Sequence, residues 1–197
     1  MQPEHEMDPK NLTALGKNLL NLIEFDENEV LVDEIRKHWF GLFVIYFFGI
    51  TASFITIIIF AILPGTFKSE ELQINLTAYA PLLAVIGLIF VTMLVISTFI
   101  ASYLYKNDVI IVTNEKIAQV LYKTIFNRKI SQLSIGDVQD VSVAQVGIFP
   151  RIFKYGTIVI ETAGEQENYK FTYVPDPYRR AKHIVGSHEK NLVRYGN

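Results

Sequence analysis

Cysteine is absent from this chain of 197 residues, which excludes disulfide bonds and thiolate metal sites. The HExxH, GxSxG, P-loop and GxGxxG motifs of several common enzyme classes are absent as well. Of the four histidines, only His183 and His188 share an expected helix, and their spacing puts them on different faces. The sequence therefore predicts a protein that is not an enzyme and that uses no metal or cofactor.

Charge is missing from two long runs in the front half of the chain. Trp39–Leu63 and Tyr79–Tyr105 contain no Asp, Glu, Lys or Arg. Each run exceeds the 18 or so apolar residues that indicate a membrane-spanning helix. At 1.5 Å per residue they extend roughly 37 and 40 Å, enough to cross a hydrocarbon core of about 30 Å. The two runs predict a helical hairpin embedded in a membrane.

The two expected spans have no ionisable residue at mid-membrane, where such residues mark most ion and proton pathways. A transporter or channel is therefore not expected. Small residues recur four apart and allow helices to approach closely: Gly49 with Ser53, Ala80 with Ala84, and Ser97 with Ala101. Packing within the hairpin is the favoured interpretation, and a dimerisation face is the alternative.

Charge is also distributed unevenly along the sequence. Residues 1–37 hold four Lys/Arg and nine Asp/Glu, whereas residues 107–197 hold twelve Lys/Arg and nine Asp/Glu. Neither excess is strong enough to indicate a nucleic-acid partner. Lys and Arg flank the outer ends of both spans, while the connecting loop 64–78 contains only Lys68. The positive-inside rule then predicts that both termini are cytoplasmic and that the loop is extracytoplasmic.

The chain divides into an acidic segment 1–37, the membrane hairpin 38–105 with its spans at 39–63 and 79–105, and a soluble domain 106–197. A cleavable signal peptide is not expected, because a long acidic segment precedes the first run. Leu12, Leu15, Leu19, Leu22 and Ile23 recur at near-helical spacing, and the pattern continues through residues 29–39. This segment lacks the basic face of a bilayer-bound helix, so packing against the soluble domain is favoured over lying on the membrane.

After Lys106 the sequence alternates with a period of two and is rich in β-branched and aromatic residues, as is typical of strands. In the last strand we expect Tyr169, Phe171 and Tyr173 to share one face. A helix begins near Asp176 and Pro177 and carries an apolar stripe. The strands are expected at 108–113, 116–123, 128–134, 140–146, 156–163 and 168–174. These elements predict a small, half-open barrel or sandwich of antiparallel strands that is closed by a C-terminal helix.

The order of several short motifs over residues 29–190 resembles the bacterial pleckstrin-homology-like membrane proteins, the YdbS-like group. The motifs are E-x-V-L…R-K-H-W before the first span, I-I-V-T-N-E-K-I (110–117), I-S-Q-L-S-I-G-D-V (130–138), G-I-F-P-R-I-F-K-Y-G-T-I (147–158) and V-P-D-P before the last helix. The resemblance implies a pleckstrin-homology-like domain of about seven antiparallel strands on the cytoplasmic face of a bacterial inner membrane. It implies no enzymatic activity.

Two segments of the soluble domain are candidates for contact with a membrane or a partner. In residues 146–156, Phe149 and Phe153 accompany Arg151 and Lys154. These could enter the lipid interface, although the favoured interpretation is that Ile152 and Phe153 seal one mouth of the barrel. The second segment is the basic helix face formed by Arg179, Arg180, Lys182 and His183. It is either a solvated face, which is favoured, or a patch for acidic lipid or a partner.

Two functions remain open on this reasoning. The leading hypothesis is an interaction or scaffold module that binds a protein partner or a second copy of itself at the membrane. The alternative is a protein of lipid sensing or envelope maintenance, which contacts anionic headgroups through the loop 146–156 and the basic helix.

Overall fold

A computed structural model describes residues 12–20, 23, 29–66, 68–69, 74–162 and 169–195. The chain forms two compact units. One unit contains Leu42–Tyr103, and the other combines Met1–Gly41 with Leu104–Asn197. Part of the expected N-terminal helical pattern, including Leu22, lies outside the described residues.

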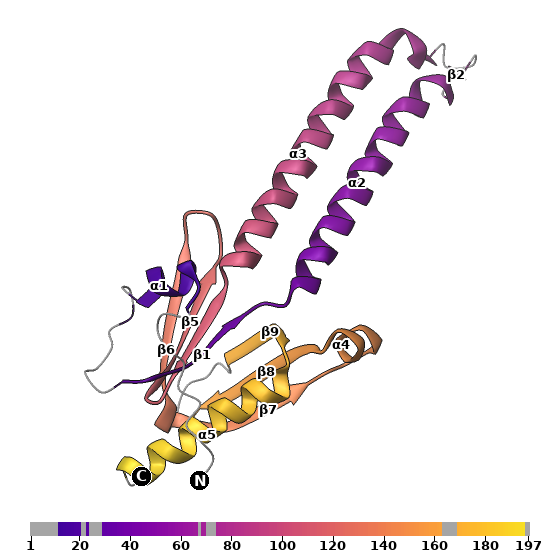
Figure 1. Cartoon of the computed structure of the whole chain (residues 1–197). Helices are drawn as coiled ribbons and strands as arrows, with labels where there is room; N and C mark the ends of the chain where they lie inside the picture. The colour runs from indigo at the N-terminus through magenta and orange to yellow at the C-terminus, as the bar shows by residue number, and fades with distance from the viewer. Residues whose placement is uncertain are drawn as a thin grey trace. The chain divides into compact units, whose positions relative to one another are not determined.

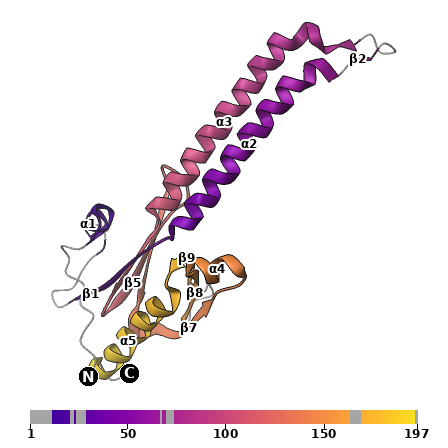
Figure 2. The ribbon, with the colours of Figure 1, turned by 45° about the vertical axis from the view of Figure 1, so that its right-hand side comes forward.

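The unit Leu42–Tyr103 is built from two antiparallel helices that run side by side (Figures 1 and 2). They belong to α2 (Trp39–Thr66) and α3 (Ala80–Asn107), and a 3-10 turn, η2 (Leu76–Tyr79), precedes α3. A short strand pair, β2 (Lys68–Ser69) with β3 (Ile74–Asn75), lies in the connecting loop. Both helices are long and apolar enough to cross a membrane, by length and composition.

Small residues allow these two helices to pack closely. A Cβ atom at Gly49 of α2 would overlap the side chain of Thr98 in α3, and one at Gly87 would lie 2.7 Å from Cγ of Phe60. The hydroxyl groups of Tyr46 and Ser102 are 2.8 Å apart and form a hydrogen bond between the helices. For Gly49, the predicted packing within the hairpin is therefore confirmed.

The other unit is mainly β and contains two antiparallel sheets. The first has the order β1-β4-β5-β6, with β1 (Leu31–Arg36), β4 (Val109–Thr113), β5 (Lys116–Tyr122) and β6 (Arg128–Ser134). The second is formed by β7 (Val138–Ala144), β8 (Tyr155–Thr162) and β9 (Tyr169–Pro175). A 3-10 turn, η3 (Ile135–Asp137), joins the sheets, and α5 (Pro177–Tyr195) packs against η3, β7, β8 and β1. The predicted domain of about seven strands with a C-terminal helix is confirmed.

The seventh strand, β1, comes from a segment for which helical spacing was expected, so that prediction is wrong for residues 31–36. Leu31 and Ile35 are four apart, which fits a helix face but also fits one face of a strand. A register shift between Leu31 and Asp33 then turns the two side chains to opposite sides of the sheet. Leu31 packs on the outer face, whereas Ile35 enters the core between the sheets.

Apolar packing covers both faces of the first sheet. Its inner face contributes to the main core with β7, β8, β9 and α5. Its outer face is covered from the N-terminal segment, where Leu12 and Ile23 are buried and α1 (Ala14–Leu20) begins. The backbone N–H and hydroxyl group of Thr13 donate to the Glu34 carboxylate at 2.9 and 2.6 Å. The segment therefore packs on the β-domain. This is the interpretation that the sequence favoured, because the segment lacks a basic face.

A cluster of ion pairs joins α5 to β1. The carboxylate of Asp33 is only 2% exposed, and it pairs with Arg180 and with Nδ1 of His183 at 3.1 Å. A buried carboxylate with two partners is stable only while the partners stay in place, because each charge is removed from water.

We expect Asp33→Asn to lower the free energy of unfolding by about 3 kcal/mol, because it leaves Arg180 partly buried without its counter-charge. Urea unfolding of the full chain in detergent micelles, followed by circular dichroism, measures this change. Arg179→Gln is the matched control, because Arg179 also has a carboxylate partner but the pair is exposed. Its Nη2 lies 3.9 Å from Oδ2 of Asp176. The control is expected to change stability by less than about 0.5 kcal/mol. Equal effects of the two variants would contradict a structural role for the cluster.

Candidate functional site

The candidate site begins at the end of the first sheet where the chain continues into α2 and returns from α3. The chain leaves β1 after Arg36, and it returns to β4 at Val109; these two residues are register partners. We call this side of the domain the crossing edge. The hydroxyl group of Tyr105 donates to the carbonyl oxygen of His38 at 2.7 Å, and the N–H of His38 donates to the carbonyl oxygen of Tyr173 at 2.6 Å. The outgoing chain is thus bonded to both the returning chain and β9.

Two charged side chains at the crossing edge, those of Lys37 and Asp108, pair with each other. Nζ of Lys37 lies 2.5 Å from Oδ2 of Asp108 and 5.1 Å from the ring centre of Tyr105. Oδ1 of Asp108 accepts a hydrogen bond from the backbone N–H of Tyr122 at 2.8 Å. Asp108 therefore joins β5 to the first residues after α3.

An aromatic cluster lies beside this edge within the same unit. Phe40 is buried and stacks on three rings, with centroid distances of 4.7 Å to Phe153, 5.2 Å to Tyr155 and 5.7 Å to Phe149. The cluster contains His38, Trp39, Phe40, Tyr105, Phe149, Phe153, Tyr155 and Tyr173. Aromatic contacts of this kind contribute beyond their buried area. They hold α4 (Ile148–Phe153) next to the first residues of α2.

Tyr173 reaches this cluster because β9 departs from simple alternation. A register shift opposite Gly156 and Ile158 makes Val174, and not Tyr173, the next core residue after Phe171. Tyr173 has a positive φ of 57° and stacks on Tyr155 at 5.1 Å. The expectation that Tyr173 shares a face with Phe171 is therefore wrong, since a bulge redirects it.

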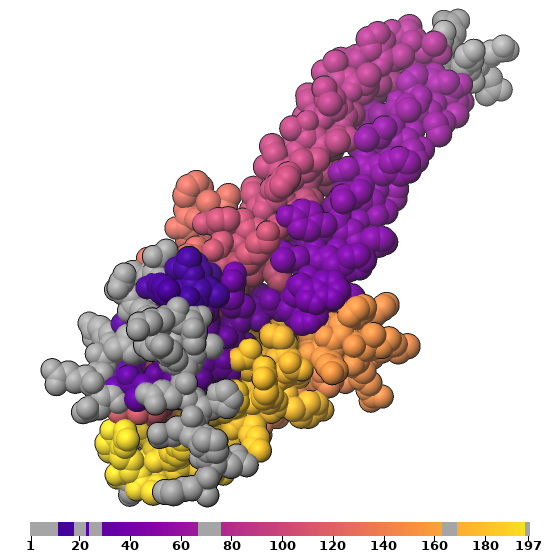
Figure 3. Space-filling model, viewed as in Figure 1, coloured from indigo at the N-terminus to yellow at the C-terminus, as the bar shows by residue number. Residues whose placement is uncertain are grey.

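The candidate segment 146–156 contains the short helix α4, and its residues separate into two groups. Phe153 is partly buried in the aromatic cluster, but Ile152 is exposed, so Ile152 does not seal the barrel. Phe149 is 60% exposed although its ring contacts Phe40. Arg151 and Lys154 are exposed, and Lys154 ends the helix in a left-handed conformation with φ 54°. Figure 3 shows α4, in orange, projecting from the surface of the domain.

A second exposed apolar group lies at the turn between β5 and β6, which sequence reasoning missed. Phe126 is 98% exposed and Ile125 is also exposed. Tyr122 pairs with Arg128, so the turn extends beyond the level of Asp108, where the chain returns from α3. The turn therefore projects from the crossing edge. An apolar pair inside a turn that is flanked by cations was the signal in the sequence.

The basic face predicted on α5 is divided by the fold. Arg180 and His183 are directed to Asp33, as described above, whereas Arg179 and Lys182 are exposed. Arg179 lines an open surface depression together with Lys154. The two candidate segments thus meet at Lys154 and Arg179, and Arg180 is removed from the candidate contact surface.

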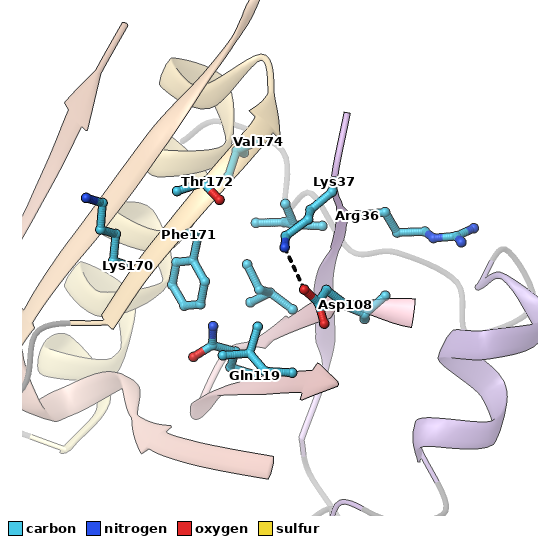
Figure 4. Close-up of a pocket in the computed structure, with 12 residues that line it drawn as sticks. Arg36, Lys37, Asp108, Gln119, Lys170, Phe171, Thr172 and Val174 are labelled. Atoms are coloured by element: carbon cyan, nitrogen blue, oxygen red, sulfur yellow. Dashed lines mark hydrogen bonds and ion pairs between the residues drawn. The ribbon is translucent and has the colours of Figure 1, made fainter. Parts of the chain in front are cut away.

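A cavity of about 140 Å³ opens between the two sheets near the crossing edge (Figure 4). Its charged or polar lining includes Lys37, Asp108, Gln119 and Lys170. Among the residues that the structure describes, no group of three or more His, Cys, Asp or Glu is placed to hold a metal ion.

The imidazole of His38 has a lowered pKa. Burial, which disfavours the charged form, lowers it from the usual 6.5, and the Asp176 carboxylate opposes this effect. Nδ1 of His38 accepts from the N–H of Phe40 at 3.2 Å, which requires that nitrogen to be unprotonated. The imidazole therefore supports the start of α2 in its neutral form.

We predict that an imidazole NMR titration of the full chain in micelles gives His38 a midpoint below 6.5. Because the folded-state pKa is lowered, the unfolded chain binds more protons, and stability declines as pH falls below about 6.5. Asp176→Asn should lower the midpoint further, since it removes the charge that raises the pKa. Asp140→Asn, at an exposed position of β7, is the control and should leave the His38 midpoint unchanged. A midpoint at or above 6.5 would contradict the burial of this imidazole.

A family model and a solved structure are similar to parts of this chain. The family model described as "Bacterial PH domain" matches residues 40–186. Among solved structures, a DUF1696 family protein with a pleckstrin-homology domain from Shewanella loihica PV-4 is similar at 15% sequence identity and a TM-score of 0.34. The match covers 41% of this chain and 70% of that chain. No curated protein matches. Since the family model spans most of the sequence, from the start of α2 into α5, the chain belongs to the bacterial PH domain family.

Proposed function

We propose that this chain is an integral membrane protein that holds its PH-like domain at the cytoplasmic face of a bacterial cell membrane. There the domain is a non-catalytic module whose crossing edge contacts the lipid interface and its anionic headgroups. Contact with lipid is the first candidate function of the domain, and protein scaffolding is the second.

Length, composition and charge support the membrane part of the proposal. α2 and the helical stretch Leu76–Asn107 are long and apolar enough to span a bilayer. Arg36, Lys37 and Lys106 flank the ends that join the domain, and the positive-inside rule assigns such ends to the cytoplasm. Trp39 stands at the first position of α2, where Trp is typical of the membrane–water interface.

The observation that carries the proposal is the position of the two exposed apolar groups. α4 contacts Trp39 and Phe40 through its aromatic rings, and these two residues begin α2. The β5–β6 turn projects beyond Asp108, which directly follows α3. Both apolar groups therefore lie beside the points where the domain joins the two long helices. Exposed apolar groups of this kind mark interaction sites in soluble domains, and here the nearest apolar phase is the bilayer.

Cations accompany both apolar groups. Arg151 and Lys154 are exposed at α4, while Lys123, Arg128 and Lys129 are exposed beside the β5–β6 turn. Each Lys or Arg close to an anionic membrane surface contributes about 1 kcal/mol, and apolar side chains in the interface add to this. The combination favours a lipid surface over a neutral protein surface.

The absence of native cysteine allows single-cysteine probes of this contact. We expect nitroxide labels on Phe126→Cys and Phe149→Cys, in full chain reconstituted into nanodiscs, to be shielded from a water-soluble paramagnetic relaxant and reached by oxygen. Val193→Cys is the matched control, because Val193 is 87% exposed on the last turns of α5. That end of α5 lies at the β4–β5 turn, since the Tyr195 hydroxyl group donates to Glu115 at 2.9 Å.

Lipid charge provides the second arm of this experiment. Nanodiscs with 30% anionic lipid, compared with zwitterionic nanodiscs, should deepen the labels at 126 and 149 and leave the label at 193 in water. Labels at 126 and 149 that are as accessible to the water-soluble relaxant as the label at 193 would rule out lipid contact by the crossing edge.

The second candidate function, a protein-interaction scaffold, rests on β6. β6 is the last strand of the first sheet, so one of its sides has no neighbouring strand among the residues that the structure describes. Unpaired backbone groups on such an edge can accept a strand from another chain. A partner strand or a second copy of this chain could bind there while the crossing edge stays at the membrane.

For this candidate we predict that a photo-crosslinking phenylalanine analogue at exposed Gln132 in β6 gives a discrete adduct in cells. The same analogue at Val193 is the control for exposure alone. Mass spectrometry then distinguishes a second copy from another protein. If the analogue gives no adduct at 132, or the same diffuse products as at 193, the scaffold function through β6 fails.

A further inference from the structure

The cavity between the two sheets lies where their edge strands come together. β1 is at the edge of the first sheet and β9 is at the edge of the second, and residues of both strands line the cavity. The volume of the cavity is about 140 Å³, close to the roughly 150 Å³ of an apolar cavity that binds benzene in another protein. Since protein interiors contain few voids larger than a water molecule, a space of this size beside the core is a candidate binding site.

The wall of the cavity is mainly apolar. Ile35, Ile110 and Phe171 line it, and each of these residues is also buried in the main core. The complete apolar lining consists of Ile35, Val109, Ile110, Leu121, Phe171 and Val174. A wall of this kind holds the hydrocarbon part of a ligand, because binding removes apolar surface from water. The similarity in volume to the benzene site limits that part to about six carbon atoms.

The charged side chains around the cavity leave its interior neutral. Lys37 and Asp108 pair with each other at 2.5 Å, so their charges offset. Arg36 donates to the carbonyl oxygen of Lys106, and Figure 4 shows Arg36 and Lys170 directed away from the cavity. An ionic ligand would lose its hydration inside the cavity and would gain no counter-charge there, which is costly. The lining therefore favours an uncharged ligand.

An uncharged polar group also faces the cavity. Gln119 is 7% exposed and lies on the inner face of β5, the face that also carries Ile117 and Leu121. Figure 4 shows its amide directed into the space beside Phe171. An amide has both N–H donors and an acceptor oxygen, so it can bond to a hydroxyl group, which also donates and accepts. A ligand made of hydrocarbon alone would cover this amide and make no hydrogen bond to it.

We propose that this cavity binds an uncharged alcohol with a compact hydrocarbon body of about six carbon atoms. The hydrocarbon body packs against Ile35, Ile110 and Phe171, and the hydroxyl group bonds to the amide of Gln119. A carboxylate or an ammonium ion of similar size binds more weakly, because its charge would be buried without a partner. The site lies between the sheets, so the proposal does not depend on the lipid contact proposed above.

The test uses the full chain in nanodiscs with 13C-labelled isoleucine methyl groups, at neutral pH. Cyclohexanol is the probe, and cyclohexylamine and cyclopentanecarboxylate are charged analogues with the same number of carbon atoms. We expect saturable shifts of the Ile35 and Ile110 methyl signals with cyclohexanol, and binding of the two ions that is weaker by about fivefold or more. The methyl signal of Ile184, which is buried on α5 and does not line the cavity, should not move. Shifts that do not saturate, or equal binding of the three probes, would overturn the proposal.

Two variants locate the bound alcohol. Gln119→Leu removes the amide at similar size and should weaken cyclohexanol binding about fivefold, because the hydroxyl group loses its partner. Gln132→Leu, at an exposed position of β6, is its matched control. Leu121→Phe adds volume to the lining and should abolish the saturable shifts. Ile130→Phe is its matched control, because Ile130 is partly buried on β6 and does not line the cavity.

The methyl spectrum without ligand shows whether each variant is folded. Both control variants should bind cyclohexanol as the unchanged chain does. Unchanged cyclohexanol affinity in folded Gln119→Leu would reject the hydrogen bond to the alcohol, and unchanged affinity in folded Leu121→Phe would reject the site. Either result overturns the proposal, whatever the depth of the labels at 126 and 149.

Discussion

The pairing of β1 with β4 is the constraint on which the rest of this domain depends. These neighbouring strands carry the chain to α2 and back from α3, so a single register, with Arg36 opposite Val109, fixes both connections. Hydrogen bonds from Tyr105 to His38 and from His38 to Tyr173 extend the pairing past the ends of the strands. The residues of both connections next to the strands are thereby bonded to the folded β-domain.

This constraint determines which side chains are available at the crossing edge. Lys37 and Asp108 form an ion pair with each other, and the ring of Phe40 stacks on those of Phe153 and Tyr155. What remains exposed is a distinct set: the apolar residues of α4 and of the β5–β6 turn, with the cations beside them. Exposed apolar groups of this kind are the basis of the proposed lipid contact.

The crossing edge and the cavity place two different chemistries close together. The crossing edge presents convex apolar groups, which suit a surface, whereas the cavity is concave and suits a small molecule. Lys37 and Asp108 belong to both, because their ion pair lines the cavity and joins the outgoing and returning chain.

Some features could be predicted because they depend on residues near one another in the sequence. Uninterrupted apolar runs predicted the two long helices, and alternation predicted β4 to β9 to within about two residues. By contrast, β1 was taken for a helix, because residues four apart share a face in both structures and only the bulge after Leu31 separates their destinations. The bulge at Tyr173 likewise made the prediction from alternation wrong, because it turns Tyr173 away from the face of Phe171.

The candidate site could also be predicted only in part from the sequence. The sequence by itself determined that the chain carries an apolar hairpin, a small β-domain of the pleckstrin-homology type, and cations near Phe149 and Phe153. Only the tertiary structure decided that Arg180 and His183 serve Asp33, that Phe126 projects from the crossing edge, and that Gln119 faces a cavity. The physical reason is that burial and pairing join residues far apart in the chain, as Asp33 and Arg180 show, and no local pattern encodes such contacts.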